Sequence, residues 1–120
     1  MNWVLVFIGG GMGSILRYFI SQHLILSKYF PWATLLSNLM ATTLLALLVV
    51  FLKSGDKPSW LLPLIGVGFC GGFSTFSTFS VENFQLFEQG QWALLTANII
   101  LSLGAGFGVF LLVSRINTSH

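Results

Sequence analysis

Four long apolar stretches, separated by short polar connections, take up most of this 120-residue sequence. They run over about residues 3–26, 31–52, 60–81 and 91–113, and a helix needs about 20 apolar residues to cross the hydrocarbon core of a bilayer. Only 7% of the residues are charged, whereas soluble domains carry about 25%, so this surface cannot face water all round. We therefore predict an all-α, multi-pass integral membrane protein with four transmembrane helices, forming one domain over residues 1–120.

The remaining composition excludes several classes of function. The formal net charge of +2 is small and scattered along the chain, which argues against a nucleic-acid partner. No nucleophile–base or metal-ligand constellation is visible, so we do not expect an enzyme. The four spans leave no room for a domain that would bind an organic cofactor. Cys70 is the single cysteine, which excludes a disulfide within one chain. The lipid bilayer is the first partner that the sequence predicts.

Charges on the connections say little about orientation. With an even number of spans, both termini and the loop at 53–59 lie on one side of the membrane. The basic residues on the two sides are Lys53, Lys57 and Arg115 against Lys28, with or without Arg17. This is a weak bias under the positive-inside rule. Insertion in both orientations, and insertion with the 53–59 loop always in the cytoplasm, both remain open.

Small residues recur at a spacing that suits close helix packing. The glycine pairs Gly9 and Gly13, Gly68 and Gly72, and Gly104 and Gly108 are each four residues apart, which lets helix backbones approach in lipid. Packing within one chain accounts for some of these pairs. Four short helices make a thin bundle with little interior, so we expect other pairs to join subunits in an oligomer.

The third span contains an unusual string, GVGFCGGFSTFSTFS, over residues 66–80. Adjacent glycines followed by Ser and Thr weaken a helix, which favours a break near 71–74. Broken backbone at membrane depth must be buried in protein or line a cavity, and its freed carbonyls could ligate a small cation. A continuous helix whose hydroxyls bond its own carbonyls is an equal alternative.

Two phenylalanines in this string, Phe76 and Phe79, are three residues apart and share a face of a helix. Packing is the commoner role of such a pair. However, aromatic rings have a positive edge, and two such edges beside hydroxyl groups could receive a small anion. They would do so without a full charge to trap it, as conduction requires.

Polar residues in the other spans add to this pattern. The amide of Asn38 offers two donors to an anion, or a hydrogen bond to another helix. Arg17 is a charged residue within a span, which is functional by default. It could set a positive potential at a pore vestibule, snorkel to the interface or cap carbonyls of a neighbouring helix. Asn98 and Ser102 are four apart and form a polar stripe on the fourth span.

In order and spacing, these residues resemble the Fluc (CrcB) family of fluoride channels. The resemblance is carried by the string GGGMGSILRY at 9–18, by Asn38 and by the string GFCGGFSTFSTF at 68–79, and it covers the whole chain. It implies an antiparallel, dual-topology homodimer in the bacterial inner membrane. That dimer would export toxic cytosolic fluoride passively through two pores.

The resemblance also implies roles for individual residues. Asn38, Phe76 and Phe79 correspond to the fluoride pore, with Ser77 and Thr78 beside it. The backbone carbonyls of Gly71 and Ser74 from both subunits would hold a sodium ion at the dimer centre, and no organic cofactor is implied. The remaining family positions are a pore vestibule and a polar track, which correspond to Arg17, Glu82, Asn98 and Ser102. Asn98 stands where the family often has an aromatic residue.

Two other classes of membrane protein compete with this interpretation. A small proton-coupled drug exporter also has four short spans, but it needs an acidic residue within the membrane. We expect Asp56, Glu82 and Glu88 in loops or at a span end, which disfavours that class. A non-transporting assembly subunit would not need the hydroxyl–phenylalanine string.

Overall fold

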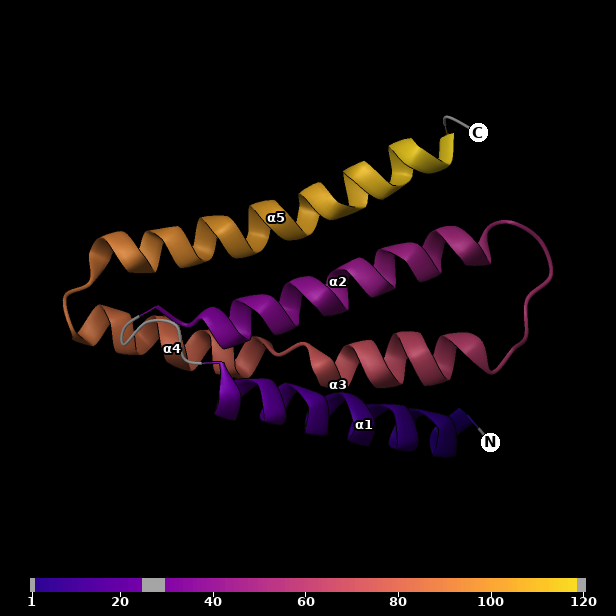
Figure 1. Ribbon diagram of the computed structural model, residues 1–120, viewed down its shortest axis with the longest axis horizontal. Helices are drawn as coiled ribbons and strands as arrows, with labels where there is room; N and C mark the ends of the chain where they lie inside the picture. Colours follow the sequence, from indigo (N-terminus) through magenta and orange to yellow (C-terminus); the bar gives the residue numbers. More distant parts are fainter. Residues whose placement is uncertain (1, 25–29, 119–120) are drawn as a thin grey trace.

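The computed structural model describes residues 2–24 and 30–118, and every regular element in these ranges is helical. The elements, in chain order, are α1 (Asn2–His23), α2 (Trp32–Leu52), η1 (Leu62–Cys70), α3 (Gly71–Phe73), α4 (Phe76–Glu88) and α5 (Trp92–Thr118). They form four long rods that lie roughly side by side (Figure 1). Within the described residues, four helical stretches are long and apolar enough to cross a membrane. The prediction of an all-α integral membrane protein with four spans is confirmed.

The bounds of three spans differ from those predicted, and the fourth, α5, ends at Thr118 and not near residue 113. Helix α1 ends at His23, and the predicted end of the first span, together with Lys28, lies outside the described residues. The third span runs to Glu88 instead of ending near Val81. Its end is set by Gly90, whose φ of 72° closes the helix, with the Gly90 and Gln91 amides donating to the carbonyls of Phe87 and Leu86.

The third span changes backbone conformation in its middle. Helix η1, which has π-type hydrogen bonding, continues directly into the short α3. Ser74 (φ −88°, ψ 160°) and Thr75 (φ −154°, ψ 122°) are then extended, and α4 begins at Phe76. The amide and hydroxyl of Ser74 both donate to the Cys70 carbonyl, at 3.0 and 2.8 Å. Two extended residues therefore separate two helical halves of this span (Figure 1).

Helix α1 packs closely against η1 and α3 because glycines line the seam. A Cβ atom on Gly9 or Gly13 would lie 2.1 or 2.2 Å from a backbone oxygen of η1, and a Cβ atom on Gly72 would lie 2.3 Å from the Gly10 oxygen. By contrast, Gly104 and Gly108 on α5 have nothing within 4 Å of such an atom. Gly9, Gly13 and Gly72 thus serve packing within the chain, and Gly104 and Gly108 do not.

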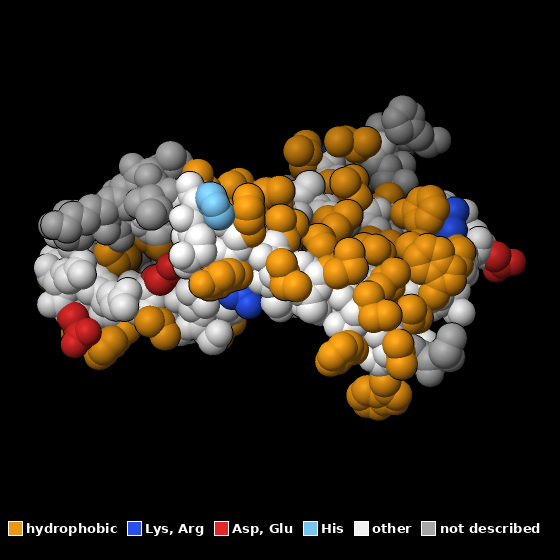
Figure 2. Space-filling view, turned by 60° about the horizontal axis from the view of Figure 1, so that its bottom comes forward, with side chains coloured by type: hydrophobic (Ala, Val, Ile, Leu, Met, Phe, Trp, Pro, Cys, Tyr) orange, Lys and Arg blue, Asp and Glu red, His pale blue; other side chains and the backbone are white. Residues whose placement is uncertain are grey.

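Much of the apolar surface is left uncovered by the chain itself. The molecule measures 51 × 36 × 20 Å, and hydrophobic side chains cover much of the face seen in Figure 2, with few charged groups among them. In the most apolar stretch of α5, 6% of the residues are buried inside the protein, against 28% in the most apolar stretch of α2. Such a surface suits lipid or another apolar protein surface and does not suit water.

Candidate functional site

The two extended residues of the third span are held by a side chain from α2. The Thr75 amide donates to Asn38 Oδ1 at 2.7 Å, and Asn38 Nδ2 donates to the Thr75 carbonyl at 3.3 Å. The Asn38 amide thus satisfies both backbone groups of one residue, as a neighbouring β-strand would. Because lipid offers no partner to exposed backbone, this pairing stabilises extended backbone at membrane depth.

Because the helix is interrupted here, two backbone amides that would donate to carbonyls of a continuous helix donate to other groups. The Gly71 carbonyl would accept from the Thr75 amide, which donates to Asn38 instead. The Ser74 carbonyl would accept from the Thr78 amide, which donates to Thr75 Oγ1 at 3.1 Å as the N-cap bond of α4. The two carbonyls that lose these donors, those of Gly71 and Ser74, are the ones that the family resemblance assigns to sodium.

Arg17 binds backbone at the end of α3. Its Nε atom donates to the Gly72 carbonyl at 3.0 Å, and Ser14 Oγ donates to the same oxygen at 3.5 Å. The carbonyl belongs to the last turn before the extended residues, where helix carbonyls lack helical donors. Of the three roles open to Arg17 from the sequence, the structure shows the capping of a neighbouring helix.

A groove with a mixed polar and apolar lining opens beside Asn38 and the two phenylalanines. It has a volume of about 250 Å³ and is lined by Asn38, Thr42, Ser74, Thr75, Phe76, Phe79, Ser102 and Leu103. The phenylalanine rings are tilted at 43° with their centroids 6.1 Å apart. Residues from α2, the extended segment, α4 and α5 therefore meet here. Four of the residues predicted for the pore or the polar track line this one groove: Asn38, Phe76, Phe79 and Ser102.

A second pocket lies between α1, α2 and α4. It has a volume of about 220 Å³, and its polar lining includes Arg17, Thr34, Ser37, Thr75 and Thr78. The side-chain oxygen of Ser37 is buried and has no hydrogen-bond partner. Thr75 lines both this pocket and the groove beside Asn38. The extended backbone thus separates two polar spaces.

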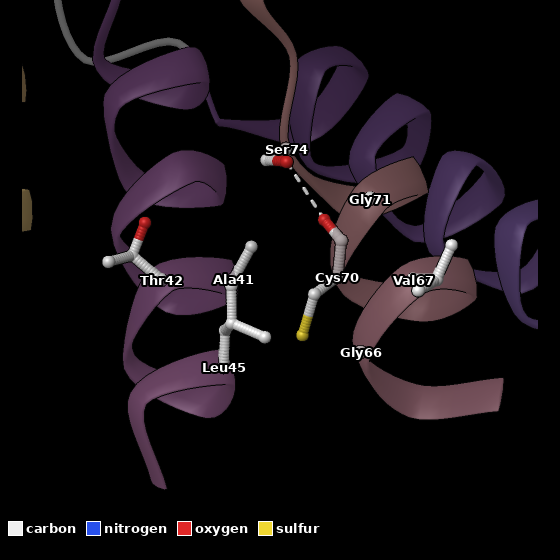
Figure 3. Close-up of a pocket in the computed structure, with 8 residues that line it drawn as sticks. All are labelled: Ala41, Thr42, Leu45, Gly66, Val67, Cys70, Gly71 and Ser74. Atoms are coloured by element: carbon white, nitrogen blue, oxygen red, sulfur yellow. Dashed lines mark hydrogen bonds between the residues drawn. The ribbon is translucent and has the colours of Figure 1, made fainter. Parts of the chain in front are cut away.

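A third cavity, of about 180 Å³, lies between α2 and the η1–α3 segment. Figure 3 shows Ala41, Thr42 and Leu45 of α2 on one side and Cys70 and Gly71 on the other. Gly71 and Ser74 both line this cavity, with Ser74 bonded to the Cys70 carbonyl at its end. The two residues predicted to hold sodium therefore share one opening.

The remaining predicted residues lie around these spaces. Ser77 Oγ is 3.2 Å from Thr75 Oγ1 and is exposed. Glu82 was expected at the end of a span, but it lies within α4 and is half-buried. Thr34 Oγ1 donates to Glu82 Oε2 at 2.9 Å, while Oε1 is buried without a partner. Helix α4 continues past Val81 to Glu88, so Glu82 lies on helical backbone and not at a helix end.

The stripe of Asn98 and Ser102 is divided between two environments. Asn98 is 1% exposed and does not line the groove, while Ser102 does. Asn98 Nδ2 donates to Asn83 Oδ1 at 2.7 Å, and Ser102 Oγ donates to Asn98 Oδ1 at 3.4 Å. The sequence analysis did not single out Asn83 or Thr75. A polar residue beside Glu82, and a threonine beside the glycine break, were the available signals.

The sequence of this chain matches a known protein family. Residues 4–114 match the family described as CrcB-like protein, Camphor Resistance (CrcB). A protein of Pyrococcus horikoshii is 43% identical over 117 residues, covering 92% of this chain and 94% of the relative. A protein of Coxiella burnetii is 37% identical over 121 residues, covering 92% and 97%. Both relatives bear the name fluoride-specific ion channel FluC.

Proposed function

The chain belongs to the CrcB family, and on that premise we propose that it is a fluoride-selective ion channel that lets toxic cytosolic fluoride leave the cell passively. The observation that carries this proposal is the similarity, along more than nine-tenths of the chain, to relatives named as fluoride-specific channels. The groove beside Asn38, which places amide and hydroxyl groups within a helical bundle, agrees with it. Such a channel moves an ion without chemical conversion and is not an enzyme.

We propose that fluoride passes through the groove lined by Asn38, Phe76, Phe79 and Ser102. Asn38 Nδ2 carries two hydrogens, and Thr75 uses one of them, so one hydrogen is left for an anion. The phenylalanine edges add weak positive potential without a formal charge. A route of weak donors suits conduction, because an ion must bind well enough to enter and weakly enough to leave.

Thr75 lies between this groove and the second pocket, and we propose that the second pocket is the vestibule. Arg17, Thr34, Ser37 and Thr78 line it. The guanidinium supplies the positive potential that attracts an anion, although its Nε atom is bound to Gly72. The hydroxyls supply donors, and the unpartnered Ser37 hydroxyl is among them. Ser77, exposed beside Thr75, and Glu82, bonded to Thr34, flank this route.

We propose that the functional unit is an antiparallel homodimer with two such pores, in the bacterial inner membrane. Phe76 lines the groove and yet is 80% exposed in the single chain, so one wall of the groove is missing. Gly104 and Gly108 of α5 have open space beside them, and α5 is the least buried of the four spans. A second copy would supply both the missing wall and the cover for α5. The weak charge bias of the connections is compatible with insertion in both orientations.

We further propose that a sodium ion at the dimer centre is held by the carbonyls of Gly71 and Ser74 from both subunits. Within the described residues no cluster of three His, Cys, Asp or Glu side chains could hold a metal, so ligands here would come from the backbone. The amides that normally serve these carbonyls are diverted, and both residues line one cavity. Carbonyl oxygens of an interrupted helix suit a small hard cation.

The proton-coupled exporter remains the alternative from another class. Glu82 lies within helix α4, in a stretch long and apolar enough to cross a membrane, so its position no longer argues against this class. The family match favours the fluoride channel over the exporter, because the relatives are named as fluoride-specific ion channels. A drug exporter would need access for a large cation to Glu82, whose Oε1 atom is buried and whose Oε2 atom is bound to Thr34.

Reconstitution into liposomes tests the proposed function. Vesicles loaded with potassium fluoride and made permeable to potassium should release fluoride when the purified protein is present. Vesicles loaded with potassium chloride should release none. Absence of fluoride release from vesicles that contain folded protein would overturn the channel proposal. Transport of a drug cation driven only by a proton gradient would support the exporter.

A further inference from the structure

A hydrogen-bond chain crosses from α4 to α5 behind the groove. Asn83 Oδ1 accepts from Asn98 Nδ2 at 2.7 Å, and Asn98 Oδ1 accepts from Ser102 Oγ at 3.4 Å. Asn98 is almost completely buried, and neither it nor Asn83 lines the groove. Of these three hydrogen-bonded residues, Ser102 is therefore the one that reaches the groove assigned to fluoride.

The direction of the Ser102 hydroxyl hydrogen decides how it meets an anion. A serine hydroxyl has one hydrogen to donate and two lone pairs that accept. Fluoride is attracted by the hydrogen and repelled by the lone pairs. While the hydrogen points to Asn98, Ser102 offers no donor to the groove. The 3.4 Å separation is long for an O–H···O bond, so the hydrogen can turn toward an arriving ion and back at little cost.

Asn83 determines which end of the Asn98 amide faces Ser102. The 2.7 Å bond holds the NH₂ group toward Asn83 and leaves the carbonyl oxygen for Ser102. Without that acceptor, the amide is free to turn and donate its NH₂ group to Ser102 Oγ. The serine hydrogen would then no longer be drawn to Asn98 and would be free to bind fluoride in the groove more tightly.

We propose that Asn83, acting through Asn98, is a positioning residue that keeps Ser102 a reversible donor to fluoride in the groove. This inference rests on the proposed fluoride channel function. It gives the buried amide pair a role in the rate of ion release, in addition to its role in joining α4 to α5. A residue of purely structural importance would act on flux irrespective of Ser102, and this difference can be measured.

The test is a double-mutant cycle of Asn83→Val and Ser102→Ala, measured as fluoride efflux from liposomes over a range of fluoride concentrations. In the Ser102 background, Asn83→Val should lower the half-saturating fluoride concentration about twofold, because Ser102 no longer gives up its weak hydrogen bond to Asn98 when it meets the ion, the low end of a net hydrogen bond. It should also slow the maximal efflux. In the Ser102→Ala background, Asn83→Val should change neither quantity.

Equal changes in both backgrounds would overturn the proposal, as would no change in the Ser102 background. If Asn83→Val does not fold, Asn98→Leu replaces it in the same cycle. That variant removes the amide and frees the same hydrogen, so the same two outcomes apply. Failure of the proposed function is read separately, as the absence of fluoride efflux from the unmodified protein.

Discussion

Substitution of Gly13 by alanine tests the closeness of the seam between α1 and the third span. The added Cβ atom would lie 2.2 Å from the Phe69 carbonyl oxygen and 2.8 Å from the Phe73 amide nitrogen. Both are backbone atoms that cannot rotate away. Ordinary contact begins near 3.4 Å, so the two helices must separate by roughly 1 Å. A gap of that size costs a quarter to a half of the dispersion energy of each contact along the seam.

We expect Gly13→Ala to destabilise the protein by about 1–3 kcal/mol, the usual cost of overpacking. The matched control is Gly11→Ala on the same helix, where a Cβ atom meets nothing within 4 Å. Both substitutions gain the same helix propensity, up to about 1 kcal/mol. The difference between them therefore isolates the collision with the third span.

Thermal unfolding of the purified variants in detergent measures the stability, and fluoride efflux from liposomes measures the function. Gly13→Ala should unfold at a lower temperature than both the control and the unmodified protein. It should also conduct less, because separation of α1 from α3 lengthens the Arg17–Gly72 hydrogen bond beside the vestibule. Equal stability of Gly13→Ala and Gly11→Ala would refute the close seam on which this reasoning depends.

Three further outcomes follow from the site. Asn38→Leu should destabilise the protein by about 2–4 kcal/mol, because both backbone groups of Thr75 lose their partner; unfolding in denaturant measures this, and an unchanged midpoint would contradict the pairing. Phe79→Ile should suppress fluoride efflux while the dimer persists on size exclusion, whereas Phe84→Ile, outside the groove, should not; similar effects of the two would remove Phe79 from the route. Replacing sodium by N-methylglucamine should weaken the dimer if the Gly71 and Ser74 carbonyls hold sodium, and indifference to the replacement would count against that site.

The four membrane spans were predictable from the sequence, because crossing a bilayer depends on the length and composition of each stretch alone. The hydropathy of a stretch can be read from its residues without knowing which other helices pack against it. The bounds were less accurate at the end of the third span, where Glu82 interrupts the apolar run but not the helix. A charged residue lowers the hydropathy of a stretch without breaking the backbone, so the apolar run ends before helix α4 does.

The candidate site was predictable as a set of residues but not as an arrangement. The glycine–hydroxyl string allowed both a continuous helix and an interrupted one. What stabilises the extended residues is the Asn38 amide, which lies 37 positions from Thr75 in the sequence. Similarly, the spacing of Asn98 and Ser102 placed them on one face of a helix, but only the packing of α4 shows that Asn98 is buried behind Ser102.

The same division applies to the glycines. Sequence alone determined that three pairs were spaced for close helix contact, since that spacing is a local property of each helix. Only the tertiary structure decided that Gly9, Gly13 and Gly72 meet backbone within the chain while Gly104 and Gly108 meet nothing. The physical reason is that a missing side chain permits close approach without selecting the surface that approaches. That choice depends on which helices the rest of the chain brings together.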